Sequence, residues 1–216
     1  MIFEKNSKLI FIGDSITDCR RKQPVGEGGA EALGFGYASF AAALINCTYP
    51  ENNYRIVNMG VDGNRVIELK ERWKRDVLDL QPDYLSIMIG VNDIWRQFHH
   101  PQMKELHVYI DEYKRTLEEL IEKALPGLKG LILMTPFFIE KNENDPMRIE
   151  VIKYGKVVKE LSEKYGAVFV NTQEGIDKLI EVNYSAHYAL DRVHPTETGH
   201  MAVAKAFLKA IGYSFS

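Results

Sequence analysis

The feature that most constrains the fold of this chain is a series of short, almost continuously apolar runs separated by longer segments with helical periodicity. Runs of strand length cover residues 8–12, 54–58, 84–89, 130–134 and 167–170. They lack the alternation of apolar and polar residues that marks a strand with one solvated face. Continuous apolar strands are typical of a parallel sheet covered on both faces. The pattern therefore predicts a parallel sheet of five strands.

The segments between these runs carry apolar residues at spacings of three and four, the periodicity of an amphipathic helix. They cover residues 37–46, 66–80, 106–124 and 149–165, and residues 197–211 close the chain in the same way. Repeated strand–helix units joined by right-handed crossovers form layered α/β folds. We predict a three-layer α/β/α sandwich with a five-stranded parallel sheet, of the flavodoxin-like type. Such sheets bind ligands at the carboxyl ends of their strands, so the chemistry should lie at that edge.

With 216 residues the chain is long enough to bury a sizeable core, and we expect one domain over residues 1–216. A formal net charge of -3 gives no electrostatic footprint for nucleic acid or an anionic membrane, so neither is expected as a partner. No apolar run approaches the ~18 residues that span a bilayer, and the first residues do not resemble a secretion signal. We expect a soluble, cytoplasmic protein in which Cys19 and Cys47 are free thiols.

Three other segments stand out by composition. Residues 19–34 form a long, glycine-rich connection, which suits either a lid or binding loop or a surface loop at a subunit contact. Both interpretations stay open. Residues 140–146 are strongly polar and are expected to form a solvated loop, and their place after the fourth strand, at the active edge, leaves a role at the rim of the site open. The mixed-charge run 68–76 is interpreted as a solvated helix face.

Polar residues follow each of the first three predicted strands. Gly13-Asp14-Ser15 ends the first strand, where glycine permits a sharp turn that presents the serine at the edge of the sheet. Gly63 follows the second strand, and its lack of a side chain lets a substrate approach its backbone N–H. Asn92 follows the third strand with an amide that can face developing negative charge. Each segment taken alone is also a common turn or helix cap.

An aspartate and a histidine stand three residues apart just before the last predicted helix. Asp191 and His194 on one loop can turn to the same side, so that the carboxylate accepts from one ring nitrogen while the other nitrogen faces a serine. This is the base-and-orienter half of a catalytic triad. A loop histidine beside a capping aspartate has the same sequence, and the pair alone does not separate the two.

Taken together and in order, Gly-Asp-Ser, Gly63, Gly-x-Asn-Asp and Asp-x-x-His-Pro resemble the four sequence blocks of the SGNH (GDSL-type) hydrolases. The resemblance covers residues 8–211. The namesake tetrapeptide of the family departs only at Ile16, where the family has leucine.

The resemblance assigns a role to each block. It implies that Ser15 is the nucleophile and that Asp191 and His194 complete the triad. It also implies an oxyanion hole made by the backbone N–H groups of Ser15 and Gly63 and the side chain of Asn92. No metal and no organic cofactor is implied.

Within the family, residues 11–19, 87–97 and 134–140 look like bacterial acetylxylan esterases. This closer resemblance implies removal of acetyl groups from xylose units of xylo-oligosaccharides, and it implies a homo-oligomer. We expect Asp14 and Trp95 to contact the substrate, the indole by stacking on a sugar ring. Core packing is the alternative for Trp95.

Two alternative functions remain at this stage. The same site could serve a lysophospholipase or a thioesterase acting on longer acyl chains. A sugar-binding protein with a vestigial active site is the alternative from another class, against which the intact set of polar residues argues. His99 and His100 lack nearby carboxylates or cysteines at ligand spacing and are expected at the surface rather than on a metal.

Overall fold

A parallel sheet forms the centre of the structure, a computed structural model that describes residues 1–214. Its strands are β1 (Lys8–Gly13), β2 (Arg55–Asn58), β3 (Tyr84–Met88), β4 (Gly130–Met134) and β5 (Val168–Val170). They are hydrogen-bonded in the order β2-β1-β3-β4-β5, and every pairing is parallel. The five-stranded parallel sheet predicted from the apolar runs is confirmed, with small differences at the strand ends.

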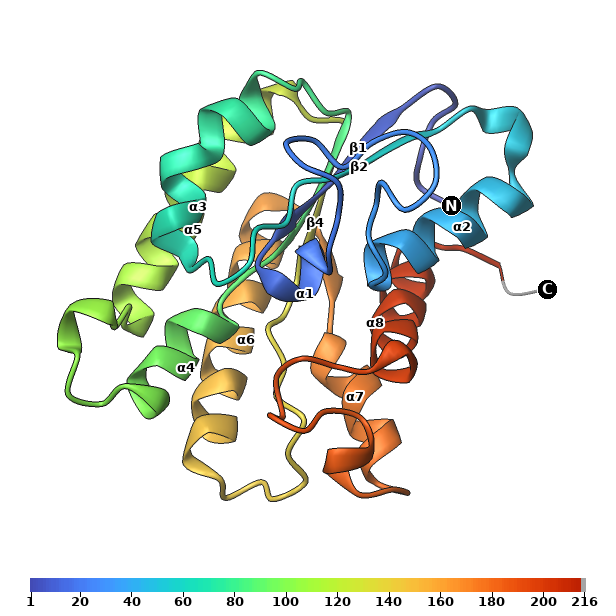
Figure 1. The fold of residues 1–216 in the computed structure, drawn as a ribbon. Helices are drawn as coiled ribbons and strands as arrows, with labels where there is room; N and C mark the ends of the chain where they lie inside the picture. Colours follow the sequence, from blue (N-terminus) through green and yellow to red (C-terminus); the bar gives the residue numbers. More distant parts are fainter. Residues whose placement is uncertain (215–216) are drawn as a thin grey trace.

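Helices cover both faces of the sheet and complete the predicted three-layer sandwich (Figure 1). One layer holds α2 (Tyr37–Thr48), α7 (Thr172–Ile180) and α8 (Glu197–Ala210). The other holds α3 (Val66–Trp73), α4 (Val91–His99), α5 (Ile110–Ala124) and α6 (Pro146–Tyr165). The remaining helical pieces are short: α1 (Ser15–Asp18), the 3₁₀ turns Pro50–Asn52, Lys104–Leu106, Leu125–Gly127 and Ser185–His187, and a π-helical turn, Lys74–Leu78, that continues α3.

Several helix boundaries differ from the predicted ones for local reasons. The helix α6 begins at Pro146 rather than at 149, because the Asp145 side chain accepts from the backbone N–H groups of Met147 and Arg148. Proline suits the first helical position, where no intrahelical donor is needed. The helices α4 and α7 were not predicted at all. Both are short, and α4 lies within the segment interpreted as a turn after the third strand.

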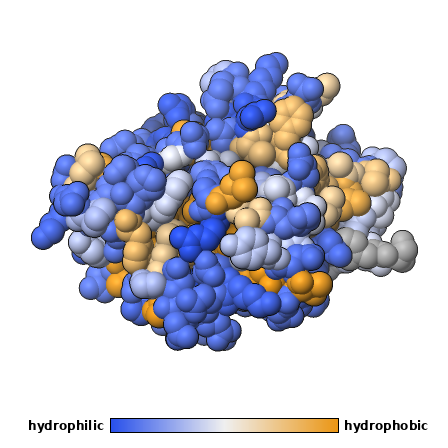
Figure 2. Space-filling model, turned by 60° about the horizontal axis from the view of Figure 1, so that its bottom comes forward, coloured by the Kyte–Doolittle hydropathy of each residue, from blue (hydrophilic) through white to orange (hydrophobic). Residues whose placement is uncertain are grey.

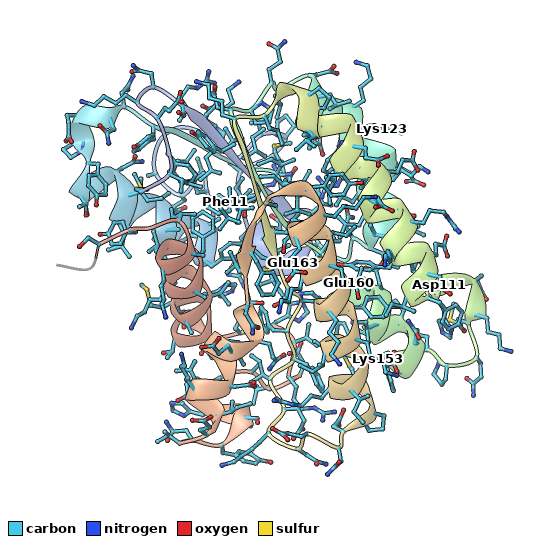
Figure 3. All side chains as sticks on the ribbon, turned by 180° about the vertical axis from the view of Figure 1, so that it is seen from behind. Phe11, Asp111, Lys123, Lys153, Glu160 and Glu163 are labelled. Atoms are coloured by element: carbon cyan, nitrogen blue, oxygen red, sulfur yellow. The ribbon has the colours of Figure 1, made fainter. Side chains whose placement is uncertain are left out.

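The hydrophobic core lies on both faces of β1, the strand whose apolar residues are almost fully buried. Phe11 packs against Phe207 of α8 and Tyr37 of α2, with ring centroids 4.9 and 5.6 Å apart. Figure 3 shows Phe11 in the interior, while charged side chains such as Lys123 and Glu160 project outward from α5 and α6. Burial on both faces explains why the strand sequences do not alternate.

The mixed-charge run 68–76 is not the fully solvated face that its composition predicts. Arg72 and Asp76 are buried, with side chains 8% and 1% exposed, and they form an ion pair of 2.9 Å. Buried charges of this kind need close partners, because their separation from water is costly. Among residues 1–214, no helix is long and apolar enough to cross a membrane.

Candidate active site

The three residues predicted to form the triad meet at the carboxyl edge of the sheet. Ser15 begins α1 directly after β1, and His194 lies on the loop that leads into α8. The Ser15 Oγ lies 2.9 Å from His194 Nε2, and His194 Nδ1 lies 2.6 Å from Asp191 Oδ2. The distances are those of a continuous hydrogen-bonded chain from hydroxyl to imidazole to carboxylate.

Asp191 orders the loop that carries the histidine. Its Oδ1 accepts from the backbone N–H groups of Val193 and His194, each at 2.9 Å. Partial burial raises the pKa of Asp191, but the hydrogen bonds from His194 and Val193 outweigh it and lower the pKa below 3.8. The ionised carboxylate accepts from Nδ1–H, which leaves Nε2 of His194 free to accept the serine hydroxyl proton.

Asp14, the second residue expected to contact the substrate, is a buried helix cap. The residue is 2% exposed, and its carboxyl accepts from the backbone N–H of Ile16 as the N-cap of α1. Burial raises its pKa to about 7, although the bond from Ile16 lowers it in part. Asp14 therefore shapes the turn that presents Ser15, and its contact with substrate stays a prediction.

The groups predicted to form the oxyanion hole have N–H donors that are free to bind a substrate oxygen. Within the described residues, neither the backbone N–H of Ser15 nor that of Gly63 donates to a protein acceptor. Gly63 lies in a turn before α3 with a φ of +73°, a left-handed conformation that glycine adopts without strain. Asn92 is buried, and its Nδ2 donates to the backbone carbonyl of Asn64 at 3.1 Å. One N–H of that amide therefore remains for an oxyanion.

Asp93 is a buried support for the same region. Its carboxyl accepts from the backbone N–H of Val66, the first residue of α3, at 3.0 and 3.3 Å. Burial raises the pKa of Asp93 to about 8. The interaction links α4 to α3 just behind Gly63 and Asn92.

A small pocket opens beside the triad. It has a volume of about 260 Å³ and is lined by Trp95, Phe98, His99, Phe138, Asp145, Pro146, Met147, Asp191 and Arg192. The Trp95 indole meets the His194 ring edge-on, with centroids 5.8 Å apart. Trp95 is half-buried and lines this pocket, and its contact with substrate stays a prediction. Figure 2, which brings this edge of the molecule forward, shows small hydrophobic patches separated by hydrophilic surface.

Arg192 was not predicted, yet it ties the triad loop to the segment after β4. Its Nη1 pairs with Glu140 at 2.8 Å and with Asp145 at 3.2 Å, and its guanidinium covers the Phe138 ring. Its backbone carbonyl accepts from Ile139 N–H. The segment 140–146 is therefore a fixed wall of the site rather than only a solvated loop.

The glycine-rich segment 19–34 is anchored rather than loose. Arg21 is buried and donates to the carbonyls of Gly60, Lys22 and Pro24. Asn58 Nδ2 donates to the carbonyl of Leu33 at 2.8 Å. None of the residues that line the small pocket comes from this segment.

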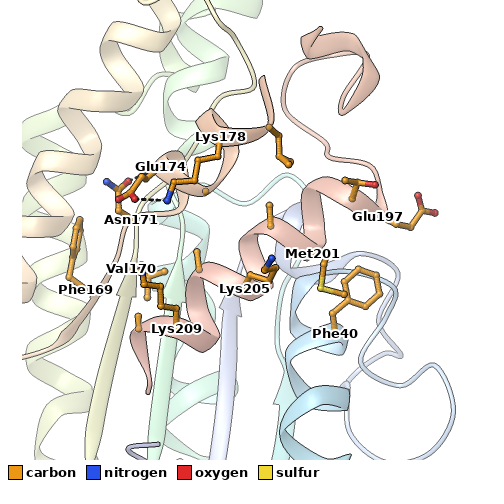
Figure 4. Close-up of a pocket in the computed structure, with 16 residues that line it drawn as sticks. Phe40, Phe169, Val170, Asn171, Glu174, Lys178, Glu197, Met201, Lys205 and Lys209 are labelled. Carbon is orange, nitrogen blue, oxygen red and sulfur yellow. Dashed lines mark hydrogen bonds and ion pairs between the residues drawn. The ribbon is translucent and has the colours of Figure 1, made fainter. Parts of the chain in front are cut away.

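A larger groove of about 1220 Å³ lies elsewhere, between α2, α7 and α8 (Figure 4). Its walls combine apolar residues such as Phe40, Phe169 and Met201 with lysines. Lys178 pairs with Glu174, four residues earlier on the same helix, α7. It contains no residue of the triad. Chemistry is therefore assigned by the reactive groups and not by the size of the cavity.

The two cysteines and the possible metal ligands lie as follows. Cys19 and Cys47 are both free thiols, as predicted. Within residues 1–214, no three His, Cys, Asp or Glu side chains are grouped to hold a metal ion.

The α/β/α sandwich, the Ser-His-Asp chain and the flanking donors define a class of serine hydrolase. The chain belongs to the GDSL-like lipase/acylhydrolase family, whose family model matches residues 11–202. The resemblance drawn from the four sequence blocks is confirmed.

Individual relatives are similar over nearly the whole chain. An acetylxylan esterase of Geobacillus stearothermophilus is 51% identical over 208 residues, 96% of this chain and 95% of its own length. The crystal structure of that organism's acetylxylan esterase Axe2 matches with a TM-score of 0.98 at 50% identity, covering 99% of this chain and 98% of Axe2. LAE5, an alpha/beta hydrolase from the metagenome of Lake Arreo, Spain, matches at 0.96 and 44% identity over 98% of each chain. Structures described as catalytic mutants of Axe2 carry S15A, D191A and H194A, and the same residue types stand at these numbers here.

Proposed function

We propose that this protein is a serine esterase that removes acetyl groups from acetylated xylose units of xylo-oligosaccharides. The observation that carries the proposal is the hydrogen-bonded chain from Ser15 through His194 to Asp191, with both outer contacts under 3 Å. The high similarity to an acetylxylan esterase supports the substrate class.

The geometry supports catalysis through an acyl-enzyme. His194 Nε2 takes the proton of Ser15 as its Oγ attacks the carbonyl carbon of the acetyl ester. Free N–H groups of Ser15, Gly63 and Asn92 stabilise the oxyanion that forms. His194 then gives its proton to the departing sugar oxygen. Water repeats the sequence on the acetyl-enzyme, releases acetate and restores the serine.

The pocket beside the triad suits a single sugar unit. Its volume of about 260 Å³ is below the roughly 300–1,000 Å³ of pockets for drug-sized ligands. Trp95 offers an aromatic face at its mouth, while Asp145 and Arg192 offer polar groups. A sugar ring with its acetyl group toward Ser15 uses both kinds of surface, whereas a long acyl chain needs a deeper apolar channel.

The decisive experiment measures turnover of esters with different acyl lengths by the original protein and by a variant that lacks the Ser15 hydroxyl. We expect kcat/KM to be highest for acetylated xylose and acetyl esters and to fall for butyryl and octanoyl esters of the same alcohol. Each buried methylene contributes about 0.8 kcal/mol, so an acyl channel would instead make octanoyl esters several kcal/mol better. Ser15→Ala should abolish turnover and covalent labelling by a fluorophosphonate. Absence of both labelling and ester turnover would favour the vestigial alternative, and a strong octanoyl preference would favour the lysophospholipase or thioesterase.

We also propose that the protein is a homo-oligomer. Leu190, Tyr184 and Val182 precede His194 closely in the sequence and are 92%, 81% and 81% exposed, and a subunit contact would cover these large apolar side chains. Light scattering should give a mass that is a multiple of 24.7 kDa, and Leu190→Glu should lower it. A monomer at micromolar concentration would refute this part. A cytoplasmic location is proposed with it, supported by the two unpaired thiols and tested by cell fractionation.

A further inference from the structure

One buried arginine contacts the strand ends that carry the candidate oxyanion-hole groups. Arg72 on α3 donates from Nη2 to the carbonyl of Gly13 at 2.8 Å and from Nη1 to the carbonyl of Met59 at 2.7 Å. Its Nε donates to Asn64 Oδ1 at 2.6 Å. Asp76 Oδ2 accepts a further bond from Nη1 at 2.9 Å and balances the charge. The guanidinium thus has a defined acceptor for each of its nitrogens.

These acceptors lie next to the groups that would face an oxyanion. Gly13 closely precedes Ser15 at the end of β1. Met59 opens the turn that contains Gly63, so one guanidinium joins the segments that supply the two backbone donors.

The third donor is reached through one intermediate. Asn64 follows Gly63, and its side chain accepts from Arg72 while its own backbone carbonyl accepts from Asn92 Nδ2. Arg72 therefore orients the residue that orients the Asn92 amide.

The chemistry of the side chain suits this task. A guanidinium offers several donors in one plane with fixed directions, whereas a lysine ammonium is a single point on a flexible stem. Asp76 is almost fully buried and also pairs with Arg75 at 2.5 Å, so the carboxylate keeps a cationic partner if Arg72 is changed.

We propose that Arg72 is a positioning residue for the oxyanion hole of the esterase reaction, an inference that rests on the proposed function. Arg72 does not touch the substrate. It fixes the spacing between the Ser15, Gly63 and Asn92 donors, so its loss should slow the chemical step more than it weakens substrate binding.

The test is a double-substitution cycle measured by steady-state kinetics on an acetyl ester. Arg72→Lys and Arg72→Met should lower kcat about tenfold or more with little change in KM. When Asn92 is already alanine, the same substitutions should have a weaker effect, and the fold loss of kcat should be at least about three times smaller than in the original protein. The reason is that part of their effect passes through the Asn92 amide.

Asn64→Ala keeps the proposal testable if Arg72→Met fails to fold. It removes the acceptor of Arg72 Nε but keeps the backbone carbonyl that binds Asn92, and it should lower kcat with KM nearly constant. Tyr84→Phe is the control. The buried Tyr84 hydroxyl donates to the Ile2 carbonyl at 3.2 Å at the start of β3, the end of the strand away from the site, so this variant should lose stability but keep kcat.

Equal losses of kcat in both backgrounds would overturn the proposal, as would a rise in KM at constant kcat or an Asn64→Ala enzyme that turns over normally. Failure of the esterase assignment is a separate result. It would appear as persistent turnover in Ser15→Ala, whatever the Arg72 variants do.

Discussion

Replacing Asn92 with alanine tests the oxyanion hole at its one side-chain donor. The amide is 2% exposed and uses one N–H to reach the carbonyl of Asn64. Its second N–H has no acceptor within residues 1–214. We expect this N–H to donate to the oxyanion that forms when the ester carbonyl becomes tetrahedral. Alanine removes this donor and leaves the backbone donors of Ser15 and Gly63 in place.

The expected loss is large in rate and small in stability. One preorganised donor in such a site contributes about 2.7–4 kcal/mol, so kcat should fall roughly 100- to 1000-fold. The variant also leaves the Asn64 carbonyl without its partner, which costs about 1–3 kcal/mol of folding free energy. For a chain of this size, each kcal/mol lowers Tm by roughly 2–4 °C, so the enzyme stays folded at 25 °C.

The assay is steady-state hydrolysis of one acetyl ester, with Tm measured on the same samples. Asn171→Ala is a control away from the site, because the Asn171 side-chain oxygen accepts from the Glu174 N–H and caps α7. It should lose stability and keep its kcat. If Asn92→Ala raises KM while kcat is unchanged, Asn92 binds the ground state and the oxyanion argument is refuted.

Three further changes test the surrounding groups. Asp191→Asn should lower kcat by about 100-fold or more, because a neutral amide no longer favours the Nδ1–H form of His194; kcat within about twofold of the original would mean that another group orients the ring. Gly63→Ala places a side chain at a φ of +73°, which should turn the backbone N–H and lower kcat. Gly166→Ala, at a φ of +63° with no atom within 4 Å of its added carbon, is the control and should lower only stability. Equal kcat in the two variants would refute a role for the Gly63 N–H. Asp93 binds its proton more tightly in the folded state, with a pKa of about 8, so its ionisation removes stability as pH rises from about 4 to 8. Asp93→Asn cannot ionise, so in urea titrations its free energy of unfolding relative to the original protein should rise by a few kcal/mol over that interval, and a difference that does not change with pH would contradict this reasoning.

Much of the fold could be predicted because strands that are buried on both faces have almost continuously apolar sequences. The strands β1 and β3 are apolar except for Lys8 and Ser86, and the longer helices of the fold show the three- and four-residue spacing of apolar side chains. The helix α4 was missed because Gly90 and Asn92 at its start are turn formers and its length gives few repeats. Local composition and final structure disagree there, and tertiary contacts decide the outcome.

The triad could also be predicted, but only from the four sequence blocks taken together, because each block alone also suits a turn or a helix cap. Ser15, Asp191 and His194 are polar residues at strand and helix ends, and the structure brings them within hydrogen-bond distance. The capping role of Asp14 was not predicted, because attention fell on its neighbour Ser15. Adjacency along the chain says nothing of direction, and its carboxyl turns inward to cap α1.

The support beneath the site could not be read from the sequence, for a physical reason. Arg72 lies in a charged run that looks solvated, and its acceptors are backbone carbonyls of Gly13 and Met59, which exist at every position and carry no residue signature. A buried guanidinium is tolerated only where several such carbonyls converge, and convergence is a property of the folded sheet edge. The reacting residues can therefore be predicted from sequence motifs. The residues that hold them at the right spacing can be identified only from the structure, where the three strand ends lie side by side.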